Sequence, residues 1–231
     1  MPATEPLRLQ LLDSFALHCD GEPVALPPSV QRLVVFVTVH DRLLLRSYVA
    51  GTLWPETSEH SAGANLRSAL WRLNRLGVRV VEAHGVTLQL APGIRIDLRE
   101  RLDDAQRLLA AGEPEIDRLD DSLFRVDLLP DWYDDWLIVE RERFHQLRLR
   151  VLESVCDRFA NRGEYARALD VGLAAVAGEP LRESAHRALV KVHLAEGNRA
   201  EAVRQYRLYS ELLKEQLGLV PSPQMLELLR S

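Results

Sequence analysis

Arginine side chains gather at one place in this 231-residue chain, on a stretch from Ser58 to Gly77 that we expect to form a single helix. No acidic residue occurs between His60 and Val81, whereas the same interval holds Arg67, Arg72, Arg75 and Arg79. A solvated helix usually mixes charges of both signs, so this segregation indicates an anionic partner. Attraction to phosphate acts over roughly a Debye length, so a local basic patch is sufficient to bind one.

The same stretch has the two-sided pattern of an amphipathic helix. Its apolar side repeats at helical spacing and consists of Leu66, Ala69, Leu70, Leu73 and Leu76. Its other side carries Ala64, Arg67, Ser68, Trp71, Arg72 and Arg75. Ser58 suits the N-cap position and Gly77 suits the helix stop, so the predicted helix has a defined beginning and end.

Two runs rich in β-forming residues follow directly, with a turn expected at Ala83-His84-Gly85. A helix followed at once by a hairpin is the order of the recognition helix and wing in a winged helix. The same order also arises where a surface helix packs beside a hairpin in any α+β domain. The local pattern therefore leaves DNA binding and a purely structural role both open.

The bulk composition fits a cytoplasmic protein of one or two domains. The N-terminal residues 1–6 lack the features of a secretion signal, and no apolar run approaches the length of a membrane span. The two cysteines, Cys19 and Cys156, form no CxxC pattern, which favours a reducing compartment. Residues 1–100 carry ten basic and ten acidic residues, so the net charge of −5 belongs to residues 101–231.

The remaining pattern predicts a small sheet first and helices afterwards. We expect strands at 7–17 and 24–26, helices at 27–41 and 46–54, and a strand at 93–98 that joins the hairpin. Further helices are expected at 103–111, where Gly112 and Pro114 end the helix, from about 136 to 161, at 165–177, and after Pro223. Trp132, Tyr133 and Trp136 are expected to form an aromatic cluster, for which core packing is favoured over an exposed partner site.

An internal repeat of 34 residues marks the second half of the chain. Gly163 recurs as Gly197 and Ala168 recurs as Ala202 at this offset. This period is typical of tetratricopeptide (TPR) helix pairs, in which small residues let two helices approach closely. Two clear units are few for a free solenoid, so neighbouring helices must help to bury their faces.

Several motifs resemble one bacterial family. The segments ALW at 69–71, EAHG at 82–85 and RIDL at 95–98 look like the winged helix of the Streptomyces-antibiotic-regulatory-protein (SARP) family. The segments LLPDWYDDW at 128–136 and LGLVPSPQM at 217–225 resemble the bacterial transcriptional activation domain that follows it. The resemblance implies an α+β winged helix of the response-regulator type at 1–99 and an all-α, TPR-like domain at 100–231.

The same resemblance implies a transcriptional activator that binds double-stranded promoter DNA, with a recognition helix near 58–76 and a wing near 78–91. The residues expected to touch DNA are Asn65, Arg67, Ser68, Trp71, Arg72, Arg75, Arg79 and His84. Some of the helix arginines would read guanine edges and others would bind phosphate, as would Arg79. Trp71 would contact a sugar or a thymine methyl, or pack against the wing, and the usual burial of tryptophan favours packing. His84 would reach the minor groove from the hairpin tip.

The family further implies RNA polymerase as a partner, contacted near residues 54–60, and a homodimer formed through the helical domain. No catalytic motif is present, so we expect no enzyme activity, no cofactor and no metal. His186 and His193 share a helix face, but no acidic or cysteine cluster completes a metal site. The alternative function is a TPR-type protein-interaction adaptor whose winged helix binds protein instead of DNA.

Overall fold

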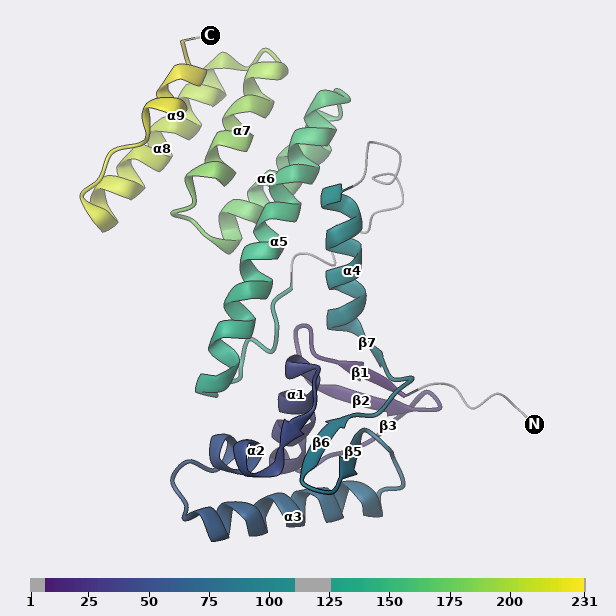
Figure 1. Cartoon of the computed structure of the whole chain (residues 1–231). Coiled ribbons are helices and arrows are strands. Elements are labelled where there is room, and N and C mark those ends of the chain that lie inside the picture. Colours follow the sequence, from purple (N-terminus) through teal and green to yellow (C-terminus); the bar gives the residue numbers. More distant parts are fainter. Residues whose placement is uncertain (1–6, 111–125, 231) are drawn as a thin grey trace. The chain divides into compact units, whose positions relative to one another are not determined.

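The computed structural model describes residues 7–110 and 126–230 (Figure 1). The chain forms two compact units, one from residues 1–100 with 127–143 and the other from residues 101–126 with 144–231. The chain therefore passes from one unit to the other three times.

The first unit begins with a four-stranded sheet in the order β3-β2-β1-β7. Its strands are β1 (Arg8–Gln10), β2 (Ala16–Cys19), β3 (Glu22–Pro23) and β7 (Arg95–Ile96). Strand β7 runs parallel to β1, with Leu9 opposite Ile96. The expectation that residues 93–98 join the hairpin is therefore wrong, because this strand closes the edge of the N-terminal sheet.

A separate three-stranded sheet has the order β4-β6-β5, from β4 (Leu44–Leu45), β5 (Val81–His84) and β6 (Thr87–Leu90). The partner that completes the hairpin is thus β4, from the segment before α2. The turn is Gly85–Val86, one step later than expected, because His84 still pairs with Thr87. Gly85 has a φ of 57°, which glycine adopts at little cost.

Three helices, α1 (Pro28–His40), α2 (Arg46–Leu53) and α3 (Glu59–Arg75), pack in the first unit (Figure 1). Helix α3 begins as expected, since the Ser58 hydroxyl accepts a hydrogen bond from the Ser61 N–H at 3.3 Å. Four of the five expected apolar residues are buried, namely Leu66, Ala69, Leu70 and Leu73. The fifth, Leu76, is 45% exposed, because the helix ends at Arg75 and Leu76 lies at its cap.

Residues 127–136 return to the first unit and attach beside β1. The Leu129 N–H donates to the Leu11 carbonyl at 3.0 Å, and the Asp13 N–H donates to the Asp127 carbonyl at 2.8 Å. The Trp132 ring lies 6.1 Å from that of Phe15. These contacts hold the segment against the connection between β1 and β2 by both its backbone and the Trp132 side chain.

The expected aromatic cluster is therefore split between separate places. Trp136 packs edge-on against Phe36 at 5.1 Å between ring centroids, whereas Trp132 packs on Phe15. Tyr133 is 91% exposed, so the expectation that it packs is wrong. From Asp131 to Trp136 the side chains alternate between exposed and half-buried positions.

Arg141 holds the same segment from the side of α5 (Asp135–Asn161). Its Nε donates to the Leu128 carbonyl at 3.1 Å, and its Nη2 donates to the carbonyls of Leu129 and Trp132. Leu129 has a φ of 43°, a conformation that a non-glycine residue rarely takes. One guanidinium thus donates to three carbonyls of an irregular turn, and the Leu129 carbonyl also accepts the Trp132 N–H at 3.1 Å.

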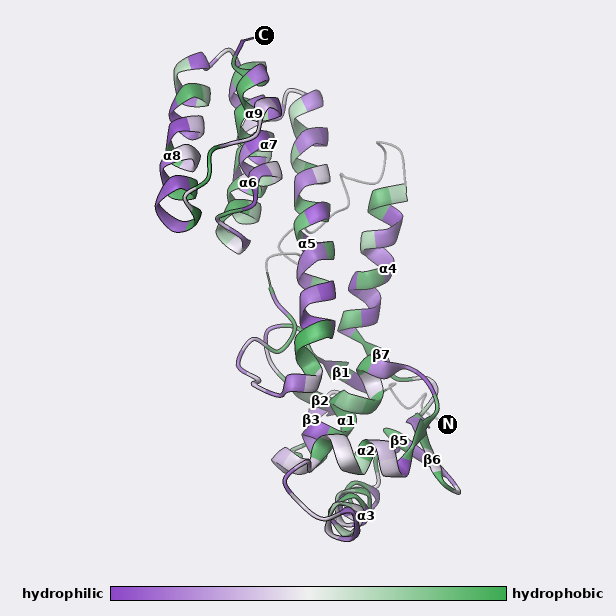
Figure 2. Ribbon diagram, turned by 60° about the vertical axis from the view of Figure 1, so that its left-hand side comes forward, coloured by the Kyte–Doolittle hydropathy of each residue, from purple (hydrophilic) through white to green (hydrophobic). Residues whose placement is uncertain are grey.

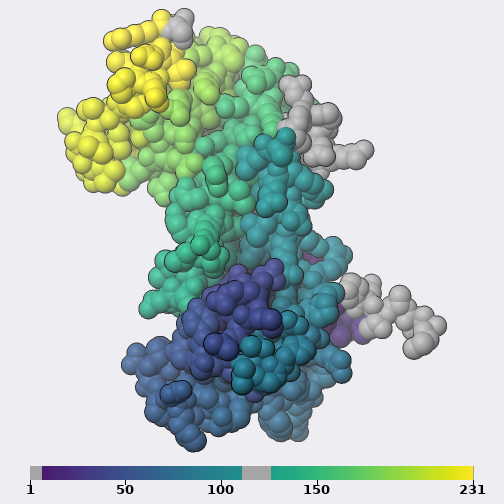
Figure 3. All heavy atoms as spheres, in the orientation of Figure 1, coloured from purple at the N-terminus to yellow at the C-terminus, as the bar shows by residue number. Residues whose placement is uncertain are grey.

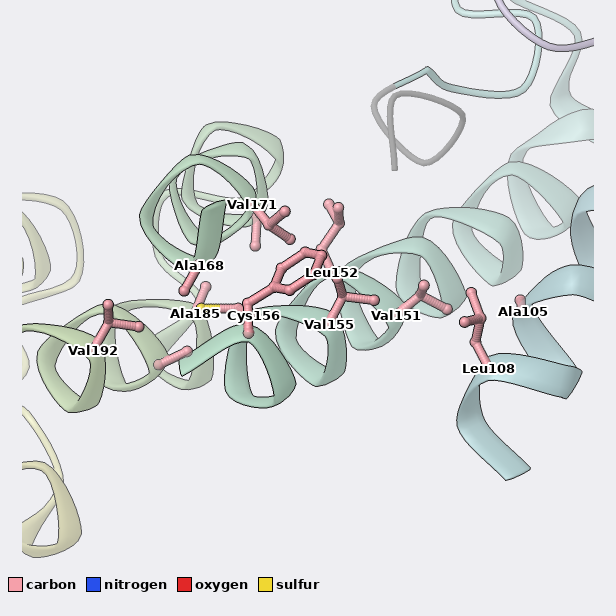
Figure 4. Close-up of a cluster of buried hydrophobic side chains, with 13 residues drawn as sticks. Ala105, Leu108, Val151, Leu152, Val155, Cys156, Ala168, Val171, Ala185 and Val192 are labelled. Carbon is pink, nitrogen blue, oxygen red and sulfur yellow. The ribbon is translucent and has the colours of Figure 1, made fainter. Parts of the chain in front are cut away.

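The second unit is helical and contains α4 (Asp97–Ala110) beyond Glu100, α5 beyond Arg143, α6 (Tyr165–Gly178), α7 (Glu183–Ala195), α8 (Arg199–Leu217) and α9 (Pro223–Leu228). Helix α4 begins six residues before the predicted start, at Asp97, whose carboxylate also accepts the N–H groups of Leu11 and Leu12 after β1. The predicted helix end at Gly112 and Pro114 lies outside the described residues. One buried cluster joins α4, α5, α6 and α7 (Figure 4).

The 34-residue repeat is visible as two helix pairs, α5–α6 and α7–α8. Gly163 and Gly197 stand in the two turns with φ values of 76° and 87°. Ala168 and Ala202 are fully buried at matching positions. A Cβ placed on Gly172 would lie 2.6 Å from a Leu189 methyl, which shows how closely α6 and α7 approach. The repeat predicted from spacing is confirmed in the helix pairing.

Candidate nucleic-acid interface

Helix α3 lies at the surface of the first unit (Figure 3), and its face opposite the buried residues Leu66, Ala69 and Leu73 is exposed. Five of the eight residues proposed to touch DNA lie on it and are exposed: Arg67, Ser68, Trp71, Arg72 and Arg75. Asn65 is half-buried, whereas Arg79 and His84 are exposed on the segment that follows. Figure 2 views α3 nearly along its axis, so its hydrophilic and hydrophobic residues can be followed around the helix.

The guanidinium groups of this face have no carboxylate partner among the described residues. Within residues 7–110 and 126–230, no ion pair includes Arg67, Arg72, Arg75 or Arg79. Other arginines of the same unit are paired, such as Arg32 with Asp134 at 2.7 Å and Arg95 with Glu100 at 2.8 Å. The charge on α3 is therefore available to an external anion.

Trp71 lies on the solvent side of α3 and is 59% exposed. The expectation that it packs against the wing is therefore wrong. Its ring instead lies below the Arg75 guanidinium, 5.4 Å from the ring centroid. This cation–π contact is worth about 0.5–1 kcal/mol at an exposed site and limits the directions in which Arg75 points.

The hairpin carries a small polar cluster that the sequence reasoning missed. The Glu82 carboxylate accepts a hydrogen bond from the Gln89 amide at 3.2 Å and contacts the His84 ring at 3.3 Å. These two contacts, first Gln89 and then His84, lower the pKa of Glu82, so its negative charge persists at mildly acidic pH. The strand register could have revealed the cluster, because Glu82 pairs directly with Gln89 and shares a strand face with His84.

The connection between α2 and α3 is exposed from Pro55 to Ser61. The Thr57 hydroxyl donates to the Trp54 carbonyl at 3.0 Å, and this hydrogen bond fixes the bend of the connection. A cavity of about 410 Å³ opens beside it, and its lining includes Arg46 and Ser47 at the start of α2. Neither residue was singled out from the sequence, because nothing in the local spacing marks them.

His186 in the second unit has a structural role, because both of its ring nitrogens contact groups of the protein. His186 is fully buried, with Nε2 at 2.9 Å from the Pro180 carbonyl and Nδ1 at 2.8 Å from the Gln205 amide. Its ring lies 4.5 Å from that of Tyr209. Across the described part of the chain, no group of three or more metal-ligating side chains comes together.

Comparison with known protein families identifies the family to which this chain belongs. Residues 96–231 match the family described as "Bacterial transcriptional activator domain". The chain belongs to this family.

Curated relatives of this activator-domain chain are regulatory proteins. The regulatory protein AfsR of Streptomyces coelicolor is 28% identical over 235 residues, which cover 96% of this chain and 24% of AfsR. The regulatory protein AfsR of Streptomyces griseus is 34% identical over 89 residues, which cover 38% of this chain and 9% of that protein. The activator-domain chain thus spans at most about a quarter of the length of these relatives.

A solved structure shares the fold of the chain. Mycobacterium tuberculosis EmbR, determined in complex with a low-affinity phosphopeptide, has a TM-score of 0.74 at 19% identity. The match covers 97% of this chain and 64% of EmbR. Together the family and the relatives confirm the predicted kinship with SARP-type transcriptional regulators. Among the described helices, none has the length and hydropathy that a membrane crossing requires.

Proposed function

We propose that this protein is a sequence-specific DNA-binding transcriptional activator whose first unit is a winged helix. Helix α3 is the recognition helix and the β5–β6 hairpin is the wing. The observation that carries the proposal is that the arginines of α3 are exposed and form no ion pair with any residue that the structure describes. A guanidinium has a fork of N–H donors that fits the O6 and N7 atoms of guanine and equally fits phosphate.

The proposed contacts divide by position. Arg67, Ser68 and Arg72 on the exposed face of α3 read base edges or bind phosphate, and Arg75 is oriented by Trp71 for the same purpose. Arg79 precedes β5 and contacts phosphate. Asn65 is half-buried, so only the exposed part of its side chain contacts DNA. His84 contacts DNA from the hairpin once its ring no longer contacts the Glu82 carboxylate. Otherwise the His84 ring stays beside Glu82, as in this structure.

The remaining parts of the function follow from the family. The proposed domains are residues 1–99 and 100–231, and residues 127–143 of the second domain lie in the first compact unit. The helical domain forms a homodimer, and the exposed connection around residues 54–60 contacts RNA polymerase. The role is regulatory and not enzymatic, in line with the named relatives.

The test measures binding of the protein to its own upstream DNA by fluorescence anisotropy at several salt concentrations. Binding through phosphates predicts a linear fall of log affinity with log salt, with a slope of about −0.9 for each phosphate neutralised. The double variant Arg67→Ala, Arg75→Ala should lose specific binding and show a smaller slope.

The matched control is the double variant Arg143→Ala, Arg204→Ala, which removes the same charge from side chains that are 72% and 77% exposed elsewhere. It should bind as the wild-type protein does. Equal losses of DNA affinity in the two double variants would show that the net charge of the protein determines binding and that α3 does not recognise the DNA sequence. The adaptor alternative predicts no binding to DNA by any of the three proteins.

A further inference from the structure

A cavity of about 410 Å³ lies between α2 and α3 in the first unit, which is a size typical of small-molecule sites. Most of its lining is apolar and consists of Ala50, Gly51, Trp54, Pro55, Ala62, Gly63 and Leu66. An aromatic or aliphatic group would be covered there by side chains from both helices. The lining also contains charged side chains, and their net charge determines the charge that a ligand should have.

The walls of this cavity are held by hydrogen bonds that need no ligand. The Arg46 N–H donates to the Val86 carbonyl at 2.9 Å, which fixes the start of α2 on the hairpin. The Trp54 N–H donates to the Ala50 carbonyl at 3.1 Å. At Gly51 a Cβ would meet no atom within 4 Å, so the space beside this residue is open. The site is therefore largely formed before a ligand arrives.

The charges around the cavity favour an anion. Arg46 and Arg67 both line it, and neither forms an ion pair with any residue the structure describes. The Arg46 Nε–H is buried and has no hydrogen-bond partner in the same part of the chain. Glu59 is the one acidic residue in the lining, so two permanent positive charges face one negative charge. One carboxylate would balance the charge and give the buried N–H an acceptor.

We propose that this cavity binds a small organic carboxylate with an apolar body, and that the bound ligand weakens the binding of DNA. The apolar body lies among Trp54, Pro55 and Leu66, and the carboxylate lies between Arg46 and Arg67. The second part rests on the proposed function, because Arg67 is also a proposed DNA contact. A guanidinium that binds the ligand is withdrawn from the DNA, and the coupling between the two ligands is reciprocal.

The first experiment tests the site without DNA. Phenylacetate is titrated into the ¹⁵N-labelled protein, with the neutral phenylacetamide as a control of nearly the same shape. The indole N–H signal of Trp54, assigned with Trp54→Phe, should shift with phenylacetate and move little with the amide. Loss of the charge-assisted hydrogen bond in Arg46→Met should weaken binding about tenfold. Equal binding of acid and amide, or no binding of either, would overturn the proposal.

A second variant reduces the volume of the cavity and leaves both arginines unchanged. Gly51→Leu fills the open space beside Gly51 and should abolish the Trp54 shift, while its circular dichroism stays that of the wild type. If phenylacetate still shifts the signal in a folded Gly51→Leu protein, the ligand binds elsewhere and the proposal fails. Arg46→Met remains as the test if Gly51→Leu does not fold.

The last experiment tests the coupling. Phenylacetate at ten times its dissociation constant should lower the affinity for upstream DNA by about tenfold if the two ligands exclude each other. The affinity of Gly51→Leu for DNA should be unchanged by phenylacetate. A protein that binds the acid but never binds DNA refutes the proposed function and leaves the carboxylate site standing. Unchanged DNA affinity in a ligand-saturated wild type refutes the coupling.

Discussion

Replacing Arg141 by methionine should detach residues 127–136 from the first unit. The substitution keeps an aliphatic stem of similar length and removes the guanidinium, which donates to the carbonyls of Leu128, Leu129 and Trp132. Leu128 and Leu129 are fully buried, so water does not readily take the place of the lost donors.

The size of the effect follows from these contacts. A hydrogen bond to a charged group contributes about 1.5–3 kcal/mol, and a buried acceptor left without a donor costs a similar amount. Two nitrogens serve the three carbonyls, so we count two independent contacts. The free energy of unfolding of the first unit should fall by about 3 kcal/mol.

The assay is urea unfolding followed by tryptophan fluorescence, because Trp132 and Trp136 lie in the altered segment and the other two tryptophans, Trp54 and Trp71, lie in the same unit. The control is Arg143→Met, two residues further along the same helix. Arg143 is 72% exposed and pairs with Glu140 at 2.7 Å, so its loss should cost about 0–1 kcal/mol. Equal losses of unfolding free energy in the two variants would refute the reasoning, since position on the helix alone would then explain them.

Two further predictions concern buried titratable groups. Burial lowers the pKa of His186 below its ordinary value of 6.5, so the unfolded chain binds the proton more tightly. The free energy of unfolding should therefore fall as pH drops below 6.5, by up to about 1.4 kcal/mol per pH unit, and His186→Gln should remove this slope. Burial raises the pKa of Cys156 to about 12, so iodoacetamide at about pH 8 should label Cys19 alone in the folded protein, as mass spectrometry would show; labelling of both thiols would contradict this.

The features that the sequence predicted correctly are those with a strong local period. Helix α3 shows its apolar residues at helical spacing and its N-cap at Ser58, so local rules alone define it. The helix pairs of the second unit are equally predictable from the sequence, because Gly163 and Gly197 mark the same turn in the two repeats.

The features that the sequence did not predict depend on partners far along the chain. Strand β7 has two residues, too few to carry a pattern that names β1 as its neighbour. The packing of residues 127–136 on the first unit required knowledge of Arg141 and Phe36, which no local period supplies. Trp71 was misjudged because average burial says little about a residue on the exposed side of a helix.

The interleaved course of the chain bears on how the protein is made. A ribosome releases residues 1–100 first, but the carbonyl acceptors and the guanidinium that finish the same unit lie at 128–141. Until those residues emerge, the Leu11 carbonyl lacks its partner and Phe36 lacks its aromatic neighbour Trp136. Translation must therefore proceed well past the last strand of the first sheet before the nascent first unit reaches its full stability.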